Sequence, residues 1–334
     1  MASFTMEDID PSLAESIQSG LEAVEERLHA AVASSDPMMR STAPYLLDAG
    51  GKRVRPVLVM LAAAFGDISE PQLVDAAALV ELTHLATLYH DDVMDAAETR
   101  RGTKAAHRVW GNHIAILTGD FLLARASAMS ANLGSEIVGI HAHTFERLCL
   151  GQLNETVGPG EGDDPFAHYI DVLSNKTGSL IATAGVLGAK IAKAPESVVS
   201  VMREYGEAVG VAFQLADDVI DIRATAEESG KTPGTDLREG VPTMPSLLLR
   251  AHVAEHPDDA ASANLLAALD ADLSSDEKLA EVVEELSAHP VVDETEKLAA
   301  SYGDRALALV DSLPAGPARD ALTAFTVSLV RRRA

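Results

Sequence analysis

Cysteine and aromatic residues are scarce in this sequence. Cys149 is the only cysteine among 334 residues, and aromatic residues make up 4% of the chain. An internal disulfide is therefore impossible, and we expect Cys149 to be a small, buried apolar residue. The sustained alternation of apolar and polar residues that is typical of strands is also missing. These gaps exclude a disulfide-framed domain and argue against an all-β fold.

Positive charge is scarce as well. The chain has 26 Lys and Arg residues against 51 Asp and Glu residues, so its formal net charge is −25. A balance this acidic disfavours a general nucleic-acid-binding surface. It does not exclude an anionic small molecule, which would bind through local basic clusters or bridging cations.

Long apolar segments are missing too. The longest uninterrupted run, residues 56–65, is well short of the roughly 20 residues that a membrane-spanning helix needs. The acidic N-terminal residues include no basic segment followed by an apolar one, so no signal peptide is visible. We therefore expect a cytoplasmic protein without a transmembrane segment.

Helical periodicity is present along nearly the whole chain. In residues 11–32, for example, Leu13, Ile17, Leu21 and Val24 recur every three or four positions. No low-complexity linker divides the chain into halves. The sequence therefore predicts an all-α fold, with residues 1–334 forming a single domain.

Three carboxylates end one of the apolar runs, LATLYHDDVMD, at residues 85–95. On a helix that advances about 100° per residue, Asp91 and Asp95 share a face with His84, and Asp92 lies on the flank. Like charges this close repel one another unless a cation neutralises them. Hard oxygen ligands suit Mg²⁺ or Mn²⁺. A solvated helix end is the alternative explanation of this cluster taken alone.

The same spacing recurs in FQLADDVID, residues 213–221, with Asp217, Asp218 and Asp221. Two such helices facing one another would line a mouth with carboxylates from both motifs. Because Mg²⁺ usually takes one or two protein carboxylates, substrate phosphate oxygens would complete its coordination. The repeat therefore predicts a metal-bridged site for a diphosphate.

Basic residues occur in segments that adjoin these motifs. They are Lys52, Arg53 and Arg55 in GGKRVRP, Arg100 and Arg101 in TRRGTKAAHR, and Lys231 in SGKTPGTD. Arginine and lysine side chains bind phosphate oxygens. Together the clusters predict two anion sites, one shared with metal ions and one held by Arg, Lys and His alone. Taken singly, each cluster is also explained as a solvated basic loop.

In this order, the motifs GGKRVRP, ELTHLATLYHDDVMD, RRG, GDFLLARA, KTGSL and GKTPGTDLREG form a specific set. From about Gly50 to Pro245 the chain resembles trans-isoprenyl diphosphate synthases of the polyprenyl synthetase family. The resemblance implies a helical bundle around a deep apolar cavity, usually in a homodimer. It also implies a prenyltransferase that condenses isopentenyl diphosphate with an allylic prenyl diphosphate, with transient membrane contact for product release.

The resemblance also implies roles for individual residues. About three Mg²⁺ ions would bind when substrate is present, with Mn²⁺ as an alternative. Their ligands would come from the two aspartate motifs: Asp91, Asp92, Asp95, Asp217, Asp218 and Asp221. Of these, Asp92 and Asp218 would contribute less directly. Isopentenyl diphosphate would be bound by Lys52, Arg53, Arg55, His84 and Arg101. The allylic diphosphate would be bound by Arg100, Lys176 and Lys231. The groups nearest the reaction would be Asp91, Asp95, Asp217, Lys176, Thr177 and Gln214.

These residue types fit the chemistry of prenyl transfer. Metal ions stabilise the diphosphate as its carbon–oxygen bond breaks, which leaves an allylic carbocation in a pocket without water. The isopentenyl double bond attacks this cation, and loss of a proton gives an allylic product five carbons longer. No protein nucleophile is required, and the sequence offers no convincing catalytic triad.

The chain departs from the family pattern after its last motif. Many relatives have a lysine where this chain has Val241. One cationic contact to the allylic diphosphate is therefore missing, and Arg238 is a candidate replacement, with an exposed loop charge as the simpler alternative. The basic residues 331–333 either close over the substrate or interact favourably with a helix C-terminus.

Two other functions have to be weighed against this one. A class I terpene cyclase also ionises a prenyl diphosphate with Mg²⁺, but its second motif is usually of the Asn/Ser/Glu type, whereas this chain repeats the aspartate motif. A regulatory subunit of a heteromeric synthase generally lacks intact aspartate motifs, and this chain has two.

Product length should depend on the helix that precedes Asp91. In short-chain relatives, bulky aromatic residues commonly occupy the positions of Ala86 and Thr87, and one turn further from the mouth Thr83 is also modest in size. Residues 71–91 would span about 30 Å as a helix. We expect a product longer than C20, of about C30 to C50, with C20 geranylgeranyl diphosphate as the alternative.

Overall fold

The computed structural model describes residues 9–224 and 233–330. Within these ranges the chain is almost entirely α-helical, as the sequence predicts. The first part of the chain forms α1 (Pro11–Val32), α2 (Pro37–Thr42), α3 (Tyr45–Asp48), α4 (Val54–Ala63), α5 (Gln72–Met94), β1 (Thr99–Arg100), β2 (Thr103–Lys104), α6 (Ala106–Trp110), α7 (Asn112–Leu133) and α8 (Ser135–Val157). The strands β1 and β2 pair in a short antiparallel hairpin directly after α5.

The remainder of the chain is also helical. Its elements are α9 (Pro165–Leu173), the π-helical turn η2 (Ser174–Gly178), α10 (Ser179–Ile191), α11 (Glu196–Arg223), α13 (Thr235–Glu239), α14 (Met244–Glu255), α15 (Ala260–Leu269), α16 (Asp276–Ser287), α17 (Pro290–Asp311) and α18 (Pro317–Val330).

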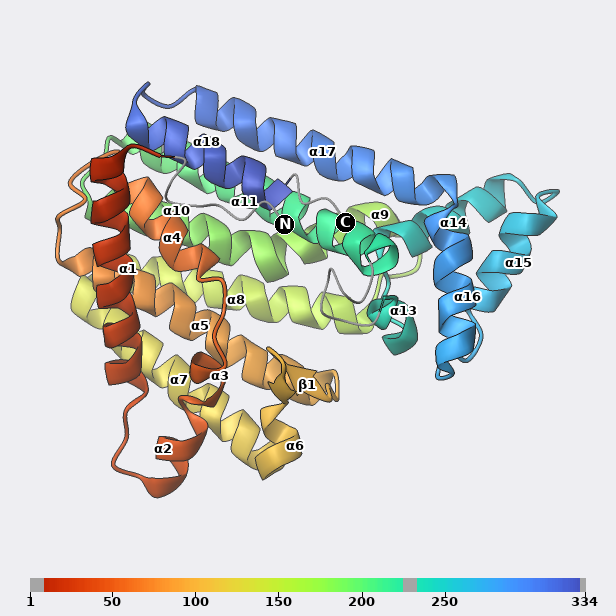
Figure 1. Cartoon of the computed structure of the whole chain (residues 1–334), viewed down its shortest axis with the longest axis horizontal. Helices are drawn as coiled ribbons and strands as arrows, with labels where there is room; N and C mark the ends of the chain where they lie inside the picture. Colours follow the sequence, from red (N-terminus) through yellow and green to blue (C-terminus); the bar gives the residue numbers. More distant parts are fainter. Residues whose placement is uncertain (1–8, 225–232, 331–334) are drawn as a thin grey trace.

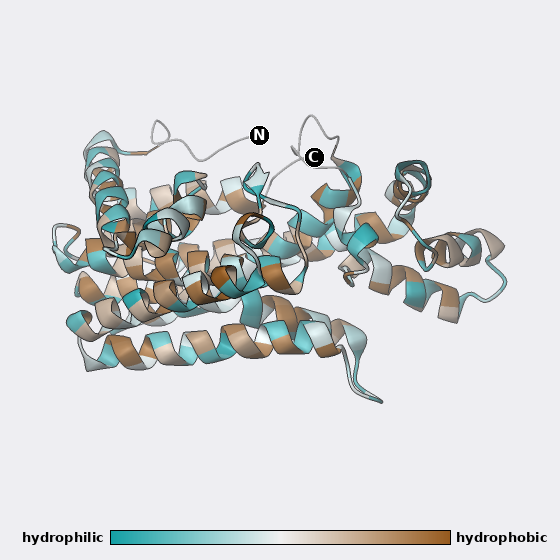
Figure 2. Ribbon diagram, turned by 90° about the horizontal axis from the view of Figure 1, so that it is seen from below, coloured by the Kyte–Doolittle hydropathy of each residue, from teal (hydrophilic) through white to brown (hydrophobic). Residues whose placement is uncertain are grey.

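The long helices α5, α8, α10 and α11 lie side by side at the centre of a bundle (Figure 1). Helix α10 is buried along nearly its whole length because it packs against α4, α5, α8 and α11. A helix that is apolar on all sides belongs in the interior of a protein. Figure 2 shows hydrophobic residues recurring along the long helices of the bundle.

Helix α1 illustrates how local sequence determines an element. The side chain of Asp10 accepts hydrogen bonds from the first backbone N–H groups of the helix, and Pro11 occupies its first position. Ile17, Val24 and Leu28 are buried against the bundle, so the predicted apolar face is confirmed. The N-cap at Asp10 and the buried apolar face therefore both stabilise this helix.

A second, smaller apolar cluster lies beyond the C-terminal end of α11. Side chains from α11, α14, α15, α16 and α17 form it, with Leu249, Leu286 and Val292 fully buried. In Figure 1 these helices extend the molecule at the blue-green end, beyond α9 and α13. Helix α17 then returns along α11, which joins this cluster to the main bundle.

The structure contradicts one expectation, the burial of Cys149, and identifies one helix of membrane-spanning length. Cys149 is exposed on α8 instead of being buried, because its position falls on the outward face of that helix. Helix α7 is long and apolar enough to span a membrane by length and composition alone, although no single apolar run in it is long. It packs along α5 and α8, so in this fold it is a helix of the bundle.

Candidate active site

Both aspartate motifs lie at C-terminal ends of long helices. Asp91 occupies the last turn of α5 and Asp95 follows as its C-cap, whereas Asp217 and Asp221 occupy the last turns of α11. The two helices end on the same side of the bundle, toward β1 and α13 (Figure 1). Asp95 is exposed, and the other three carboxylates named here are half-buried. The structure therefore brings the two motifs to one end of the fold, as predicted.

The middle carboxylate of each motif is directed into the protein. Asp92 is fully buried and accepts a hydrogen bond from Arg100 Nε at 2.6 Å. Asp218 is also buried and accepts hydrogen bonds from the Tyr169 hydroxyl at 2.8 Å and the Met244 backbone N–H at 3.0 Å. Any contribution of Asp92 or Asp218 to metal binding is therefore indirect, through the position of its neighbours.

The site has an unbalanced electrostatic environment. The pKa of Asp91 is raised to about 6, chiefly by burial and also by the adjacent Asp95, while Lys176 opposes the shift. Burial likewise raises the pKa of Asp218 to about 8. The Oδ2 atom of Asp92 is buried without a hydrogen-bond partner in the described chain. The raised pKa of Asp91 fits a divalent cation at the mouth of the site, because a cation would favour the ionised form of this carboxylate.

The protein alone does not form a closed metal cage. Among residues 9–224 and 233–330, no three His, Cys, Asp or Glu side chains converge on a point that could hold a metal ion. The carboxylates of the two motifs are hard oxygen donors that suit Mg²⁺, which commonly binds through one or two carboxylates and takes its other ligands from water and substrate phosphates. The donor set is thus suited to a metal ion that arrives with a phosphorylated substrate.

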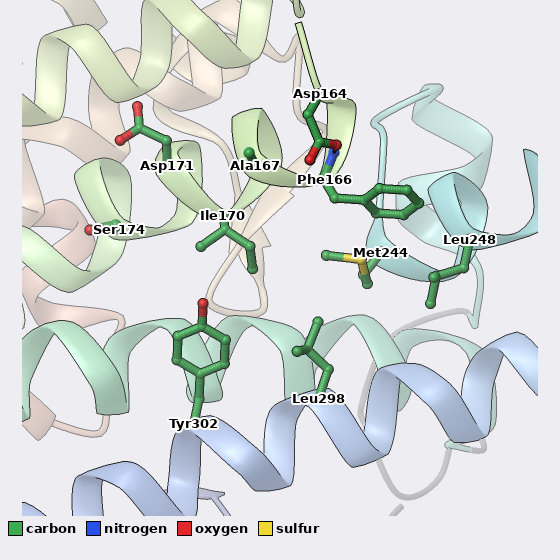
Figure 3. A pocket seen from close by; sticks show the side chains of 10 residues that line it. All are labelled: Asp164, Phe166, Ala167, Ile170, Asp171, Ser174, Met244, Leu248, Leu298 and Tyr302. Carbon is green, nitrogen blue, oxygen red and sulfur yellow. Dashed lines mark hydrogen bonds between the residues drawn. The ribbon is translucent and has the colours of Figure 1, made fainter. Parts of the chain in front are cut away.

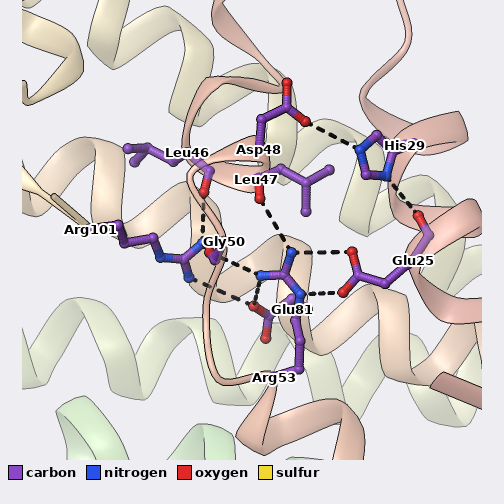
Figure 4. Close-up of polar contacts among 9 residues, drawn as sticks. All are labelled: Glu25, His29, Leu46, Leu47, Asp48, Gly50, Arg53, Glu81 and Arg101. Atoms are coloured by element: carbon purple, nitrogen blue, oxygen red, sulfur yellow. Dashed lines mark hydrogen bonds and ion pairs between the residues drawn. The ribbon is translucent and has the colours of Figure 1, made fainter. Parts of the chain in front are cut away.

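A basic cluster surrounds the buried carboxylate of Glu81, one turn before His84 on α5 (Figure 4). Arg53 donates to Glu81 and, through two nitrogens, to Glu25 of α1. Arg101, from the β1–β2 hairpin, lies 3.8 Å from Glu81 and donates to the backbone carbonyls of Leu46 and Gly50. Glu81 therefore holds two arginines from distant segments beside each other.

Both of these arginines adopt a strained backbone conformation. Arg53 has φ of 48° and Arg101 has φ of 53°, in the left-handed region that residues with a Cβ rarely occupy. Such strain costs about 1 kcal/mol or more per residue and tends to persist at functional sites. The ion pairs with Glu81 offset this cost and fix the direction of both side chains.

Arg55 and His84 complete the basic cluster. The Nε atom of Arg55 is buried without a hydrogen-bond partner in the described chain, and burial together with the charge of Arg101 lowers its pKa. Burial and the neighbouring arginines also hold the pKa of His84 well below its usual value. In the free protein the neutral imidazole of His84 is therefore favoured, and a neutral imidazole can donate one hydrogen bond to an anion.

Lys176 and Thr177 lie on the π-helical turn η2, between α9 and α10. The turn approaches α11 closely, since a Cβ atom added at Gly210 would lie 2.5 Å from the Cα atom of Gly178. Lys176 pairs with Glu155 of α8 and contributes to the electrostatic field at Asp91. Single π-helical turns often occur at functional sites, and this one directs a cation toward the first motif.

The predicted chain-length residues occupy different environments. Ala86 and Thr83 are fully buried, and Thr87 is half-buried with its hydroxyl bonded to the His84 carbonyl. Thr83 donates to the Leu79 carbonyl and therefore accepts a hydrogen bond from His141 Nε2 of α8 at 3.0 Å. Helix α8 thus closes the space beside this part of α5.

In the described part of the chain, the remaining predicted residues form few contacts that define the site. Lys52 is exposed, and Gln214 of α11 is half-buried. Lys231 and the basic residues 331–333 lie outside the described residues. Arg238 forms an ion pair with Asp276 of α16, which favours the simpler explanation of its charge over compensation for Val241.

Sequence reasoning missed three residues that organise the site: Glu81, Glu155 and Tyr169. Glu81 precedes His84 by three positions and was available as the first residue of ELTH. Glu155 and Tyr169 come from α8 and α9, which approach the motifs only through tertiary packing. No local spacing connects them with Lys176 or Asp218.

A separate pocket of about 620 Å³ lies between α9, α14 and α17 (Figure 3). Phe166 and Ile170 of α9 face Met244 of α14 and Leu298 and Tyr302 of α17 across it. None of the site residues predicted from the sequence lines this pocket. Its relation to the site is indirect, since the Met244 backbone N–H holds Asp218.

Comparison with known proteins assigns the chain to a family. The sequence pattern of the polyprenyl synthetase family matches residues 36–286, which include both aspartate motifs and the basic cluster. The chain belongs to the polyprenyl synthetase family. It is 42% identical over 323 residues to nonaprenyl diphosphate synthase of Mycobacterium tuberculosis, and the match covers 96% of this chain and 95% of that protein. This polyprenyl synthetase is thus a transferase of isoprenoid biosynthesis.

Solved structures of polyprenyl synthetases share the fold. A polyprenyl synthase from Caulobacter crescentus superposes with a TM-score of 0.88 at 31% identity and 100% coverage of both chains. Geranylgeranyl pyrophosphate synthase from Corynebacterium glutamicum superposes with a TM-score of 0.84 at 41% identity, covering 96% of this chain and 98% of that one. Both were crystallised with calcium and isoprenyl diphosphate.

The Glu81 cluster generates a stability prediction for this polyprenyl synthetase. Glu81→Gln should lower the free energy of unfolding by about 3 kcal/mol, because it leaves two partly buried arginines without their shared carboxylate. Urea unfolding monitored by circular dichroism measures the change. The control is Asp75→Asn, which breaks an ion pair with Arg27 between two side chains that are each 33% exposed. It should change the stability by less than about 1 kcal/mol, and equal losses in both variants would contradict the role given to Glu81.

Proposed function

We propose that this enzyme extends an allylic prenyl diphosphate with isopentenyl diphosphate, using Mg²⁺, and releases a trans-polyprenyl diphosphate longer than C20. One observation carries the proposal: the helices of the two aspartate motifs end on the same side of the bundle, and α5, which bears the first motif, also bears Glu81, the carboxylate that holds Arg53 and Arg101. Two diphosphates could therefore bind within reach of one another.

The acidic side of the site would hold the allylic diphosphate. Asp91, Asp95, Asp217 and Asp221 would bind Mg²⁺, which supplies Lewis-acid stabilisation of the departing diphosphate when bound. Lys176 would contribute a direct cationic contact, because it already lies close enough to influence the pKa of Asp91. Arg100, held by Asp92, and Lys231 remain further candidates for this contact.

The basic side of the site would hold isopentenyl diphosphate without a metal ion. Arg53, Arg55 and Arg101 supply positive charge, and neutral His84 supplies a hydrogen-bond donor. Lys52 adds an exposed cation at the rim. An arginine cluster that is oriented before substrate arrives loses little side-chain entropy on binding, so this subsite is suited to a small, highly charged substrate.

The reaction needs little covalent chemistry from the protein. The carbon–oxygen bond of the allylic substrate breaks, and the electron pair leaves with the diphosphate. The isopentenyl double bond then attacks the allylic carbon, and a proton lost to the departing diphosphate restores a double bond. Thr177 and Gln214 would place polar groups beside the reacting carbons, while the packed helices around them exclude water.

Metal dependence is the first test of this proposal. EDTA should abolish product formation and Mg²⁺ should restore it. Asp91→Ala and Asp217→Ala should each lower the turnover rate by orders of magnitude, with native circular dichroism, because removing one of several repelling carboxylates does not destabilise the metal-free protein. The control, Asp163→Ala in an exposed loop, should keep full activity. Turnover in EDTA would reject the proposed use of metal.

Product length is supported by the sequence and by a relative. Ala86 is small at the expected floor of the prenyl path, and the relative from M. tuberculosis is named as a nonaprenyl diphosphate synthase. The similar structure from C. glutamicum is named as a geranylgeranyl pyrophosphate synthase, which keeps a C20 product as the second candidate. We favour the longer product because no bulky aromatic residue occupies positions 86 or 87.

Larger side chains at the floor of the prenyl path test the assignment of a long product. Ala86→Phe or Thr87→Phe should shorten the product, because an aromatic ring would occupy space needed by the growing chain. Mass spectrometry of products from isopentenyl diphosphate and individual allylic primers measures the length. The control is Ala267→Phe at an exposed position of α15, which should leave the products unchanged. A wild-type enzyme that stops at C15 would contradict the small-floor argument.

We also propose a homodimer formed through α7 and α8. Large apolar side chains are exposed on these two adjacent helices, including Leu117 and Leu153, both 55% exposed, and Leu150, 48% exposed. An apolar surface of this kind commonly marks a protein interface. A second copy of the chain would cover it, and Cys149 on the same face of α8 would then become buried.

The dimer is tested by placing a charge on this face. Leu153→Asp should reduce the molar mass measured by light scattering from that of a dimer to that of a monomer, because an unpaired carboxylate is costly in an apolar interface. Ala267→Asp, at an exposed position of α15, should leave the mass unchanged. A wild-type protein that is monomeric at micromolar concentration would refute the proposed interface.

Partners and location follow from the same features. The net charge of −25 disfavours nucleic acid, and helix α7 has a place in the bundle and in the proposed dimer. We place the enzyme in the cytoplasm, with brief membrane contact during release of its apolar product.

A further inference from the structure

Arg147 of α8 joins three elements behind the reacting groups. Its Nη2 atom donates to Glu207 Oε2 of α11 at 3.0 Å, and its Nη1 atom donates to the other carboxylate oxygen. Its Nε atom donates to Asn175 Oδ1 at 2.8 Å, and Nη2 also contacts the hydroxyl of Ser174 at 3.1 Å. The Ser174 hydroxyl donates to Glu207 Oε2 at 2.7 Å. One guanidinium therefore connects α8 and α11 to the first two residues of η2.

The residues held in this way directly precede Lys176 and Thr177. A π-helical turn is less stable than an α-helical one and needs external support. Here the Ser179 N–H closes the turn on the Ser174 carbonyl, and the Ser179 hydroxyl donates to the Asn175 carbonyl. The turn also meets α11 at Gly210, where there is no space for a side chain.

We propose that the Arg147–Glu207 ion pair is a positioning device that holds η2 in place, so that Lys176 and Thr177 are presented to the allylic diphosphate. The inference rests on the proposed function of Lys176 and Thr177. Neither Arg147 nor Glu207 touches the substrate; both act through the turn between them. Because Glu207 precedes Gln214 by two helical turns on α11, the pair also fixes the height of η2 relative to Gln214.

The planar fork of arginine is essential to this role. Arg147 contacts Glu207 through two nitrogens and Asn175 through the third, a geometry that a lysine ammonium cannot reproduce. Arg147→Lys therefore keeps the charge and removes the orientation. A displacement of η2 by about 1 Å would be enough to lower the rate by up to about 100-fold.

The experiment measures turnover and KM for both substrates in Arg147→Lys. The turnover rate should fall about 10-fold to 100-fold and KM for the allylic substrate should rise, whereas KM for isopentenyl diphosphate should stay within about twofold. The matched control is Arg250→Lys, which alters another two-nitrogen ion pair, with Asp270. That variant should retain wild-type kinetics. Equal losses for both substrates, or in both variants, would overturn the proposal.

A double-mutant cycle separates positioning from general stability. In a Lys176→Ala, Thr177→Ala background, Arg147→Lys should change the turnover rate by less than about twofold, because the groups it positions are gone. Full additivity would overturn the proposal. Should Arg147→Lys not fold, Asn175→Ala carries the same test: it removes the acceptor of Arg147 Nε, together with the Asn175 Nδ2 donor to Asp171 at 3.0 Å. A wild-type enzyme that does not elongate prenyl diphosphates would instead reject the proposed function.

Discussion

Like charges are gathered at two places in this protein, and each group needs compensation from an opposite charge. At the arginine cluster the compensation is internal, because the buried carboxylate of Glu81 holds Arg53 and Arg101. At the aspartate motifs, burial together with the neighbouring Asp95 raises the pKa of Asp91 to about 6 even with Lys176 nearby, so this carboxylate favours a cation. The first group is therefore ready for an anion, whereas the second is ready for cations that bring an anion with them.

The helical bundle holds the arginine cluster and the aspartate motifs near each other but apart, so their charges do not neutralise one another. Helix α5 carries Glu81, His84 and Asp91 along one length of about three turns, so the separation between the subsites is set by helical rise. The buried partners of Asp92 and Asp218 anchor the ends of α5 and α11. Catalysis that depends on placing two substrates to within about 1 Å benefits from such rigid supports, because misplacement is costly in rate.

The sequence was sufficient for the fold class, the family and the grouping of the two motifs, because helical periodicity and motif spacing are local properties. It was not sufficient for the inward direction of Asp92 and Asp218, which depends on Arg100, Tyr169 and the Met244 backbone. It also gave the wrong environment for Cys149, since the exposed face of α8 is decided by which helices pack against it. The neutral state of His84 likewise follows from arginines that only tertiary packing brings together.

The central claim is that one diphosphate subsite needs metal and the other does not. Isothermal titration calorimetry with isopentenyl diphosphate and with a non-reactive thio analogue of an allylic diphosphate, each with Mg²⁺ and with EDTA, tests it directly. The account predicts that isopentenyl diphosphate binds in both conditions, whereas the allylic analogue binds only with Mg²⁺. Tight binding of the allylic analogue in EDTA, or complete loss of isopentenyl diphosphate binding there, would contradict it.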